Sequence, residues 1–234
     1  IGEFDDERNH ILPSAGELTP AKVARVIAAR IRRFYTSDSI DNRLTFLDNK
    51  EKQLDQTPAK ITRTPFYCSG CPHNTSTVVP EGSRAVAGIG CHYMVTWMNR
   101  NTTEFTQMGG EGHNWVGLAP FVSHQHRFQN LGDGTYTHSG LLAVHAAVVQ
   151  QANITYKILY NDAVAMTGGQ VAEGHLTPQQ ISQQVMALGA KQVVITSDDT
   201  DKYRQQPPFA KGATIHHRSE LDQLQRKLRE TKGV

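Results

Sequence analysis

The chain has 234 residues, of which 38% are hydrophobic and 20% charged, and its formal net charge is +2. This composition is that of an ordinary globular domain, and the near-neutral charge argues against nucleic acid or a membrane surface as a partner. No run of 18 apolar residues predicts a transmembrane helix, and no signal-peptide pattern opens the chain. The 3 cysteines are too few for a disulfide scaffold, so we expect a reducing, cytoplasmic environment.

The first 62 residues precede the main alternating pattern. Apolar residues with helical spacing predict a helix over 18–35, and Thr19 before a proline is a typical N-cap. Residues 36–62 are polar without a clear apolar period, so we interpret them as a linker lying over a surface. We therefore expect 1–62 to be a helix and linker, not a separate domain, and 63–234 to be the domain proper. The absence of an initial methionine leads us to expect a fragment of a longer chain.

From residue 83 onward, short apolar runs alternate with helical segments. The predicted strands are 84–89, 128–131, 154–160, 192–196 and 213–216, and the predicted helices are 139–151, 178–188 and 220–230. Thr177 and Ser219 stand where the last two helices need N-caps. Alternation of this kind predicts an α/β fold with a doubly wound, mostly parallel sheet.

A Gly-Asp-Gly turn follows the second predicted strand at Gly132, Asp133 and Gly134. Parallel sheets bind ligands at the carboxyl ends of their strands, and a helix beginning near Thr137 would point free N–H groups at an anion. A carboxylate beside a phosphate site favours a bridging divalent metal. The competing interpretation is an ordinary strand-to-helix turn in which Asp133 caps the helix.

Asn161 comes directly after the next predicted strand, one helix and one strand beyond Asp133. In a parallel sheet the two residues then lie at neighbouring strand ends, and the amide oxygen of Asn161 is a hard metal ligand. The segment continues to Thr167-Gly168-Gly169-Gln170. This combination resembles the diphosphate–Mg²⁺ motif of thiamine diphosphate enzymes, in the branch formed by the 2-oxoacid:ferredoxin oxidoreductases.

Longer segments narrow the resemblance to the indolepyruvate ferredoxin oxidoreductases, in the long fused form found in bacteria. The matching segments, in order over about residues 60–230, are RTPFYCSGCPHNTSTVVPEGSRAVAGIGCHYM, TQMGGEGHNWVGLAPF, FQNLGDGTYTHSGLLAVHAAVV and NITYKILYNDAVAMTGGQ. The resemblance implies a Rossmann-like thiamine diphosphate-binding fold. It also implies three Mg²⁺ ligands: the side chains of Asp133 and Asn161 and the carbonyl of Ala163. The residues that it places beside the cofactor are Gly132, Gly134, Thr135, Thr167 and Gly168.

The resemblance further implies an activity. The full enzyme would oxidatively decarboxylate aryl 2-oxoacids such as indolepyruvate with coenzyme A and ferredoxin, together with the remaining domains of the chain and as a homo-oligomer. In this family the glutamate that activates the cofactor comes from a separate domain, and Glu111 does not replace it, so we expect little activity from this chain alone. Two alternatives stay open: another 2-oxoacid substrate, such as pyruvate or 2-oxoglutarate, and a non-catalytic zinc-binding module.

The cysteines form a Cys68-x-x-Cys71 pair with Cys91 further along. Three thiolates with His73 or His92 would suit zinc, whereas a redox pair normally opens a helix in a thioredoxin-like unit, which is absent here. A [4Fe–4S] cluster needs four thiolates. The resemblance matches these cysteines to three cluster ligands and lacks the fourth. A cluster in the full-length enzyme, zinc and free thiols all stay open, and we expect no intact cluster in this chain.

Three of the 11 histidines are candidate catalytic groups. His73 follows the cysteine pair, His113 follows the glycine-rich GGEG segment, and His138 lies in the helix after the Gly-Asp-Gly turn. Histidine titrates near neutral pH, so any of them would suit proton transfer or substrate binding.

Overall fold

The computed structural model describes residues 4–5, 7–13, 16–56 and 63–234. The chain divides into two compact units, Ile1–Arg63 and Thr64–Val234. Within the described residues, no helix is both long enough and apolar enough to cross a membrane.

The first unit contains two helices, α1 (Pro20–Ile31) and α2 (Asp38–Gln56). The predicted cap is confirmed, because the Thr19 hydroxyl accepts a hydrogen bond from the backbone N–H of Lys22 at 3.2 Å. The linker prediction for 36–62 is wrong over most of its length, because α2 occupies it; residues 57–62 lie outside the described part of the chain.

Helix α2 packs against α1 through three apolar residues that share one face. Ile40, Leu44 and Leu47 have spacings of four and three, and they line a shallow groove together with Ala28 and Ile31 of α1. An ion-pair network joins the same two helices, in which Arg25 binds Asp48 and Glu51, each at 2.7 Å. An amphipathic stripe this narrow is easily missed among polar residues.

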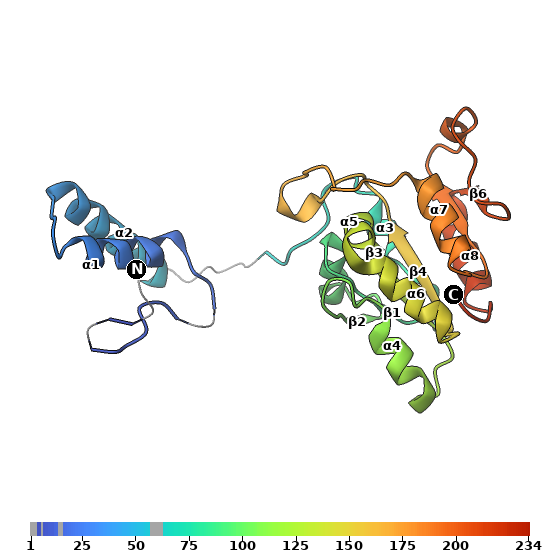
Figure 1. The fold of residues 1–234 in the computed structure, drawn as a ribbon, viewed down its shortest axis with the longest axis horizontal. Coiled ribbons are helices and arrows are strands. Elements are labelled where there is room, and N and C mark those ends of the chain that lie inside the picture. The colour runs from blue at the N-terminus through green and yellow to red at the C-terminus, as the bar shows by residue number, and fades with distance from the viewer. Residues whose placement is uncertain (1–3, 6, 14–15, 57–62) are drawn as a thin grey trace. The chain divides into compact units, whose positions relative to one another are not determined.

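The second unit is built on a four-stranded parallel sheet with the order β2-β1-β3-β4 (Figure 1). The strands are β1 (Ala85–Val86), β2 (Thr102–Glu104), β3 (Arg127–Gly132) and β4 (Ile154–Leu159). A separate two-stranded parallel sheet pairs β5 (Val194–Ser197) with β6 (Thr214–His217). The prediction of an α/β fold with parallel strands is confirmed, although β1 is shorter than 84–89 and β2 was not predicted.

Six helices accompany these strands in the second unit. They are α3 (His73–Ser76), α4 (His113–Leu118), α5 (Asp133–Thr135), α6 (Leu141–Val149), α7 (Pro178–Ala187) and α8 (Leu221–Leu228). A π-helical turn over Tyr136–Gly140 joins α5 to α6, so the chain becomes helical directly at Asp133 and not near Thr137 as predicted.

The two predicted N-caps have different outcomes. Thr177 caps α7 in a full capping box with Gln180, as the sequence predicts. Ser219 does not cap α8. A 3₁₀ turn over 218–220 precedes that helix, and the His217 ring accepts the backbone N–H of Ser219. The chain therefore forms a 3₁₀ turn before α8 begins, and no side chain caps the N-terminus of α8 itself.

The core lies where α6 and α7 cover one face of β3 and β4. One buried cluster joins Leu131, Tyr136, Val144, Ile181 and Val185, and a second joins Trp115, Ala147, Ala152 and Ile154. Strand order reverses at β1, because the chain passes from β1 to β2 on one side and then to β3 on the other. The carboxyl ends of β1 and β3 therefore flank a topological switch point, which is where open α/β sheets bind ligands.

Candidate functional site

Asp133 lies at the carboxyl end of β3 and holds the end of β4. One carboxylate oxygen of this buried side chain accepts the backbone N–H groups of Asn161 and Asp162 at 3.1 and 2.7 Å. The other accepts the N–H of Gly134 at 2.9 Å. Asp133 and Asn161 therefore meet at neighbouring parallel strand ends, the placement that the sequence predicts.

The loop after β4 closes on itself beside this turn. The backbone groups of Val164 and Gln170 pair in an antiparallel bridge, and the Thr167 hydroxyl donates to the Gln170 side chain at 2.8 Å. Gly168 and Gly169 have positive φ angles of 125° and 81°, a region that favours glycine and that this tight loop needs. Thr167 and Gly168 are exposed, and Gly134 lies next to Val164 at the base of the loop.

His92, which the sequence suggests only as a possible zinc ligand, is buried beneath the strand ends. The ring packs so close to Gly88 that a Cβ on that glycine would lie 2.6 Å from His92 Nε2. A Cβ on Gly132 would lie 3.4 Å from His92 Cε1. Burial lowers the pKa of His92 to about 4, and its Nε2 has no hydrogen-bond partner among the described residues.

Glu111, for which the sequence indicates no catalytic role, is a second buried group. Its side chain is fully buried, and one carboxyl oxygen accepts the N–H of Gly109 at 2.7 Å. Burial raises the pKa of Glu111, and hydrogen bonds from backbone N–H groups oppose that shift. The other oxygen has no partner in the described structure, and the same holds for the side-chain oxygens of Gln129 and Asn130 on β3. Buried polar atoms without protein partners are rare, and a bound water, ion or ligand would satisfy them.

The three candidate histidines do not come together. Both ring nitrogens of His73 are buried without described partners, and burial lowers its pKa, against the opposing effect of the Asp133 charge. His113 begins α4 and is exposed. His138 is also exposed, and its ring contacts the Ser139 hydroxyl at 2.7 Å. Of the three histidines, His73 is the one whose pKa the charge of Asp133 affects.

The cysteines are free thiols that lie near one another. A tight turn forms the pair, since the N–H of Cys71 donates to the carbonyl of Cys68 at 3.0 Å. Burial raises the pKa of Cys91, and charge on Cys71 and Cys68 raises it further, which places all three thiols in one region. Within the described residues, no group of three or more His, Cys, Asp or Glu side chains is arranged to hold a metal ion.

Comparisons with known proteins give relatives that share one name. The chain is 24% identical over 183 residues to indolepyruvate oxidoreductase subunit IorA of Thermococcus kodakarensis. It is 25% identical over 183 residues to the protein of the same name from Pyrococcus abyssi. Each match covers 70% of this chain and 27% of the relative, so the chain corresponds to about a quarter of these relatives. No family model matches the chain.

The fold is similar to that of a 2-oxoglutarate:ferredoxin oxidoreductase from Magnetococcus marinus, solved with 2-oxoglutarate, coenzyme A and succinyl-CoA bound. The TM-score is 0.53 at 15% identity, over 76% of this chain and 64% of the other. The curated relatives support a domain of the 2-oxoacid:ferredoxin oxidoreductase family, and the solved structure supports its fold. The resemblance that the sequence showed is thereby confirmed at the level of the family.

Proposed function

We propose that residues 64–234 form the diphosphate-binding half of a thiamine diphosphate site in a 2-oxoacid:ferredoxin oxidoreductase. The observation that carries this proposal is the contact of the buried Asp133 carboxylate with the backbone amides of Asn161 and Asp162. It joins the end of β3, which flanks the switch point of the parallel sheet, to the end of β4, where Asn161 follows.

The donor set fits Mg²⁺ and a diphosphate. An ionised carboxylate has about four acceptor positions, and three N–H groups occupy three of those on Asp133. The remaining position, with the side-chain oxygen of Asn161 and the carbonyl of Ala163, gives the hard oxygen ligands that Mg²⁺ prefers. Gly132, Gly134 and Thr135 would lie beside the diphosphate, and Thr167 and Gly168 would contribute from the loop after β4.

The chain's contribution to catalysis would be binding and orientation. Bound thiamine diphosphate supplies the electron sink for decarboxylation of a 2-oxoacid. In this chain, Asp133 holds the two strand ends in register, and the unpartnered ring nitrogens of His73 offer a hydrogen bond or a proton to a ligand. His113 and His138 remain candidates for contacts supplied in the complete enzyme.

A partner surface would cover the site. Val164, Met166 and Val171 follow β4, and their side chains are exposed by 37%, 56% and 76%. Exposed apolar residues next to a binding crevice are typical of a surface covered by another domain. We propose that the domain carrying the activating glutamate lies there in the full-length enzyme, which would act with coenzyme A and ferredoxin as a homo-oligomer.

The three cysteines would supply three of the four thiolates of a [4Fe–4S] cluster in that enzyme, with the fourth ligand outside this set. His73, two residues after Cys71, senses the charge of Asp133, which supports a place for the cysteine pair near the proposed cofactor site, where an electron acceptor would be needed. Zinc and free thiols remain the competing interpretations for Cys68, Cys71 and Cys91.

Amide NMR of this chain, titrated with thiamine diphosphate and Mg²⁺, tests the cofactor proposal. We expect shifts at Gly134, Asn161 and Asp162 that require both ligands, because all three amides contact Asp133. Asp133→Asn should weaken binding at least about tenfold, since the metal loses a charged ligand.

Asp162→Asn is the matched control, because its exposed side chain pairs with His175 and its φ of 60° is one that Asn tolerates. It should leave the affinity unchanged. The absence of shifts at these amides at about 10 mM ligand would contradict the proposal and favour a non-catalytic zinc-binding module.

Indolepyruvate is the substrate that we propose, since the curated relatives carry that name. The solved neighbour acts on 2-oxoglutarate, which makes that compound and pyruvate the competitors to test. Comparing kcat/KM of the full-length enzyme for the three oxoacids decides among them, and a preference for either competitor would contradict the assignment.

A further inference from the structure

Residues 64–83 carry Cys68, Cys71 and His73, and we call them the cysteine segment. In the described structure, the backbone hydrogen bonds of this segment are internal, and none joins it to a strand or helix outside 64–83. Its helix α3 is 4 residues long, has no side-chain cap and buries none of its residues. Side chains from elsewhere in the unit must therefore hold the segment in place.

Four cationic side chains make these contacts. Each donates to a backbone carbonyl of the cysteine segment: Arg218 to Pro72, Arg100 to Asn74, Lys157 to Val78 and Arg229 to Glu81. Among the described residues, every hydrogen bond between the segment and the rest of the unit comes from these four side chains. Charged donors form hydrogen bonds about twice as strong as neutral donors do, so they can replace backbone pairing.

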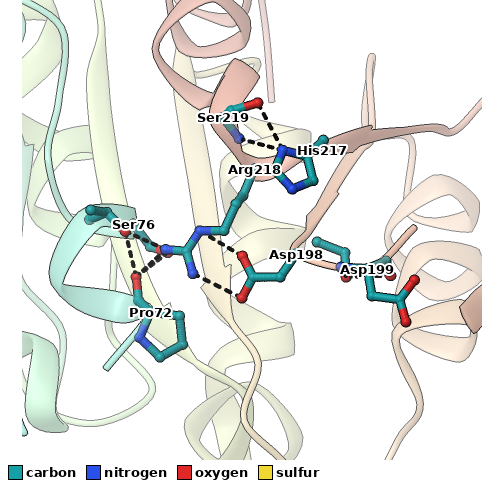
Figure 2. Close-up of polar contacts among 9 residues, drawn as sticks. Pro72, Ser76, Asp198, Asp199, His217, Arg218 and Ser219 are labelled. Carbon is teal, nitrogen blue, oxygen red and sulfur yellow. Dashed lines mark hydrogen bonds and ion pairs between the residues drawn. The ribbon is translucent and has the colours of Figure 1, made fainter. Parts of the chain in front are cut away.

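Arg218 joins the cysteine segment to the two-stranded sheet (Figure 2). Two of its nitrogens pair with the Asp198 carboxylate at 3.1 and 3.2 Å. The third donates to the carbonyl of Pro72 at 2.6 Å and to the Thr75 hydroxyl. Asp198 follows β5 and Arg218 follows β6, so this ion pair connects the ends of both strands to the start of α3. The planar guanidinium fixes these contacts in one geometry, which a lysine ammonium cannot do.

Arg100 holds the same helix from the chain before β2. Its guanidinium donates to the carbonyl of Asn74 at 2.5 Å and to the side-chain oxygen of Asn74 at 2.7 Å. Both arginines therefore bind the single helical turn that follows Cys71 directly. The cysteine pair cannot shift with this turn unless one of these sets of contacts breaks.

We propose that Arg218 and Arg100 are positioning residues for the cysteine pair. They fix where Cys68 and Cys71 lie relative to Cys91, which begins a separate 3₁₀ turn after β1. His73 begins α3, so its position near Asp133 depends on the same two side chains. These roles do not depend on whether the thiols hold a cluster, zinc or no metal.

Amide hydrogen exchange of the 234-residue chain, followed by NMR, tests this proposal. The N–H groups of Thr75, Ser76 and Thr77 donate to the carbonyls of Pro72 and His73, so their exchange reports opening of α3. Arg218→Gln and Arg100→Gln should each speed this exchange at least about tenfold, the size expected when hydrogen bonds from a charged donor are lost. The amides of β3 and β4 should keep their rates, because the change is local.

Arg204→Gln is the matched control. Arg204 forms an exposed ion pair with Asp201 at 2.9 Å, and in the described structure it does not bind the cysteine segment. This variant should leave the exchange of α3 unchanged. Amides of α3 that are unprotected in the unmodified chain would overturn the proposal, as would equal acceleration over the whole unit in both test variants.

Thiol alkylation by iodoacetamide, measured by mass spectrometry, gives a second readout. Arg218→Lys keeps the positive charge and loses the planar fork, so a change in thiol reactivity reports position and not charge. Cys71 is partly buried and should react at least about threefold faster in this variant, whereas Cys68 is already exposed and should keep its rate. Wild-type exchange and wild-type Cys71 reactivity in Arg218→Lys would contradict the proposal. None of these measurements involves thiamine diphosphate, so this proposal and the proposed function fail independently.

Discussion

At the scale of single residues, burial without a charged partner distinguishes the informative positions. Lys157, Glu111 and His92 are all ionisable, and burial shifts the pKa of each toward the neutral form. Such groups lower stability unless a ligand or a proton compensates them. They therefore mark positions where the domain keeps an ionisable side chain although its burial lowers the stability of the fold.

The pKa of Lys157 leads to a prediction about stability. Its folded pKa of about 7 lies below the unfolded value of 10.5, so between these values the unfolded chain binds more protons. Stability should therefore rise with pH across this window, by up to ~1.4 kcal/mol per pH unit from this group. Urea unfolding at several pH values measures the slope. Lys157→Met should lose it and Lys211→Met should keep it, whereas parallel curves for all three proteins would contradict the prediction.

At the scale of elements, the loop before α4 fixes Glu111 against the sheet. The Tyr156 hydroxyl on β4 donates to the carbonyl of Glu111 at 3.0 Å. The chain then turns through Gly112, whose φ is 91°. The sequence shows a glycine-rich segment here, but the close contact with Tyr156 depends on the register of β4.

Replacing Gly112 with alanine should destabilise the second unit by more than ~2 kcal/mol, because a Cβ there would lie 2.2 Å from the Tyr156 oxygen at a positive φ. Gly117→Ala is the control, because Gly117 lies within α4 and a Cβ would meet nothing within 4 Å. It should be neutral or stabilising by ~0.5 kcal/mol. Urea unfolding compares the two variants, and equal free energies of unfolding would refute this account.

The helices and strands also show which predictions a local sequence pattern can support. Strands β3 and β4 and helix α7 follow clear apolar runs and caps, and they lie close to where the sequence predicts them. Helix α2 was missed because only three of its residues, all partly buried, form an apolar stripe in a polar sequence. Strand β2 is 3 residues long, too short for its sequence to show a period.

At the scale of the whole molecule, the second unit contains its own core. Both buried clusters consist only of residues from Trp115 onward, and all named strands belong to 64–234. We expect residues 64–234, expressed alone, to unfold cooperatively with a melting temperature within a few degrees of that of the whole chain. Calorimetry compares the two proteins, and the loss of a cooperative transition in the shorter one would show that the first unit is needed for folding.

The sequence by itself determined the parallel α/β fold, the family resemblance and the meeting of Asp133 with Asn161. These follow from local order, because successive parallel strands place the residues after them at one edge of the sheet. Only the tertiary structure placed Glu111 and His92 beneath that edge and gave Lys157 two neutral hydrogen-bond partners. Whether a buried polar atom finds a partner depends on contacts between distant segments, such as Lys157 with Val78 and Gln225, and no local pattern encodes them.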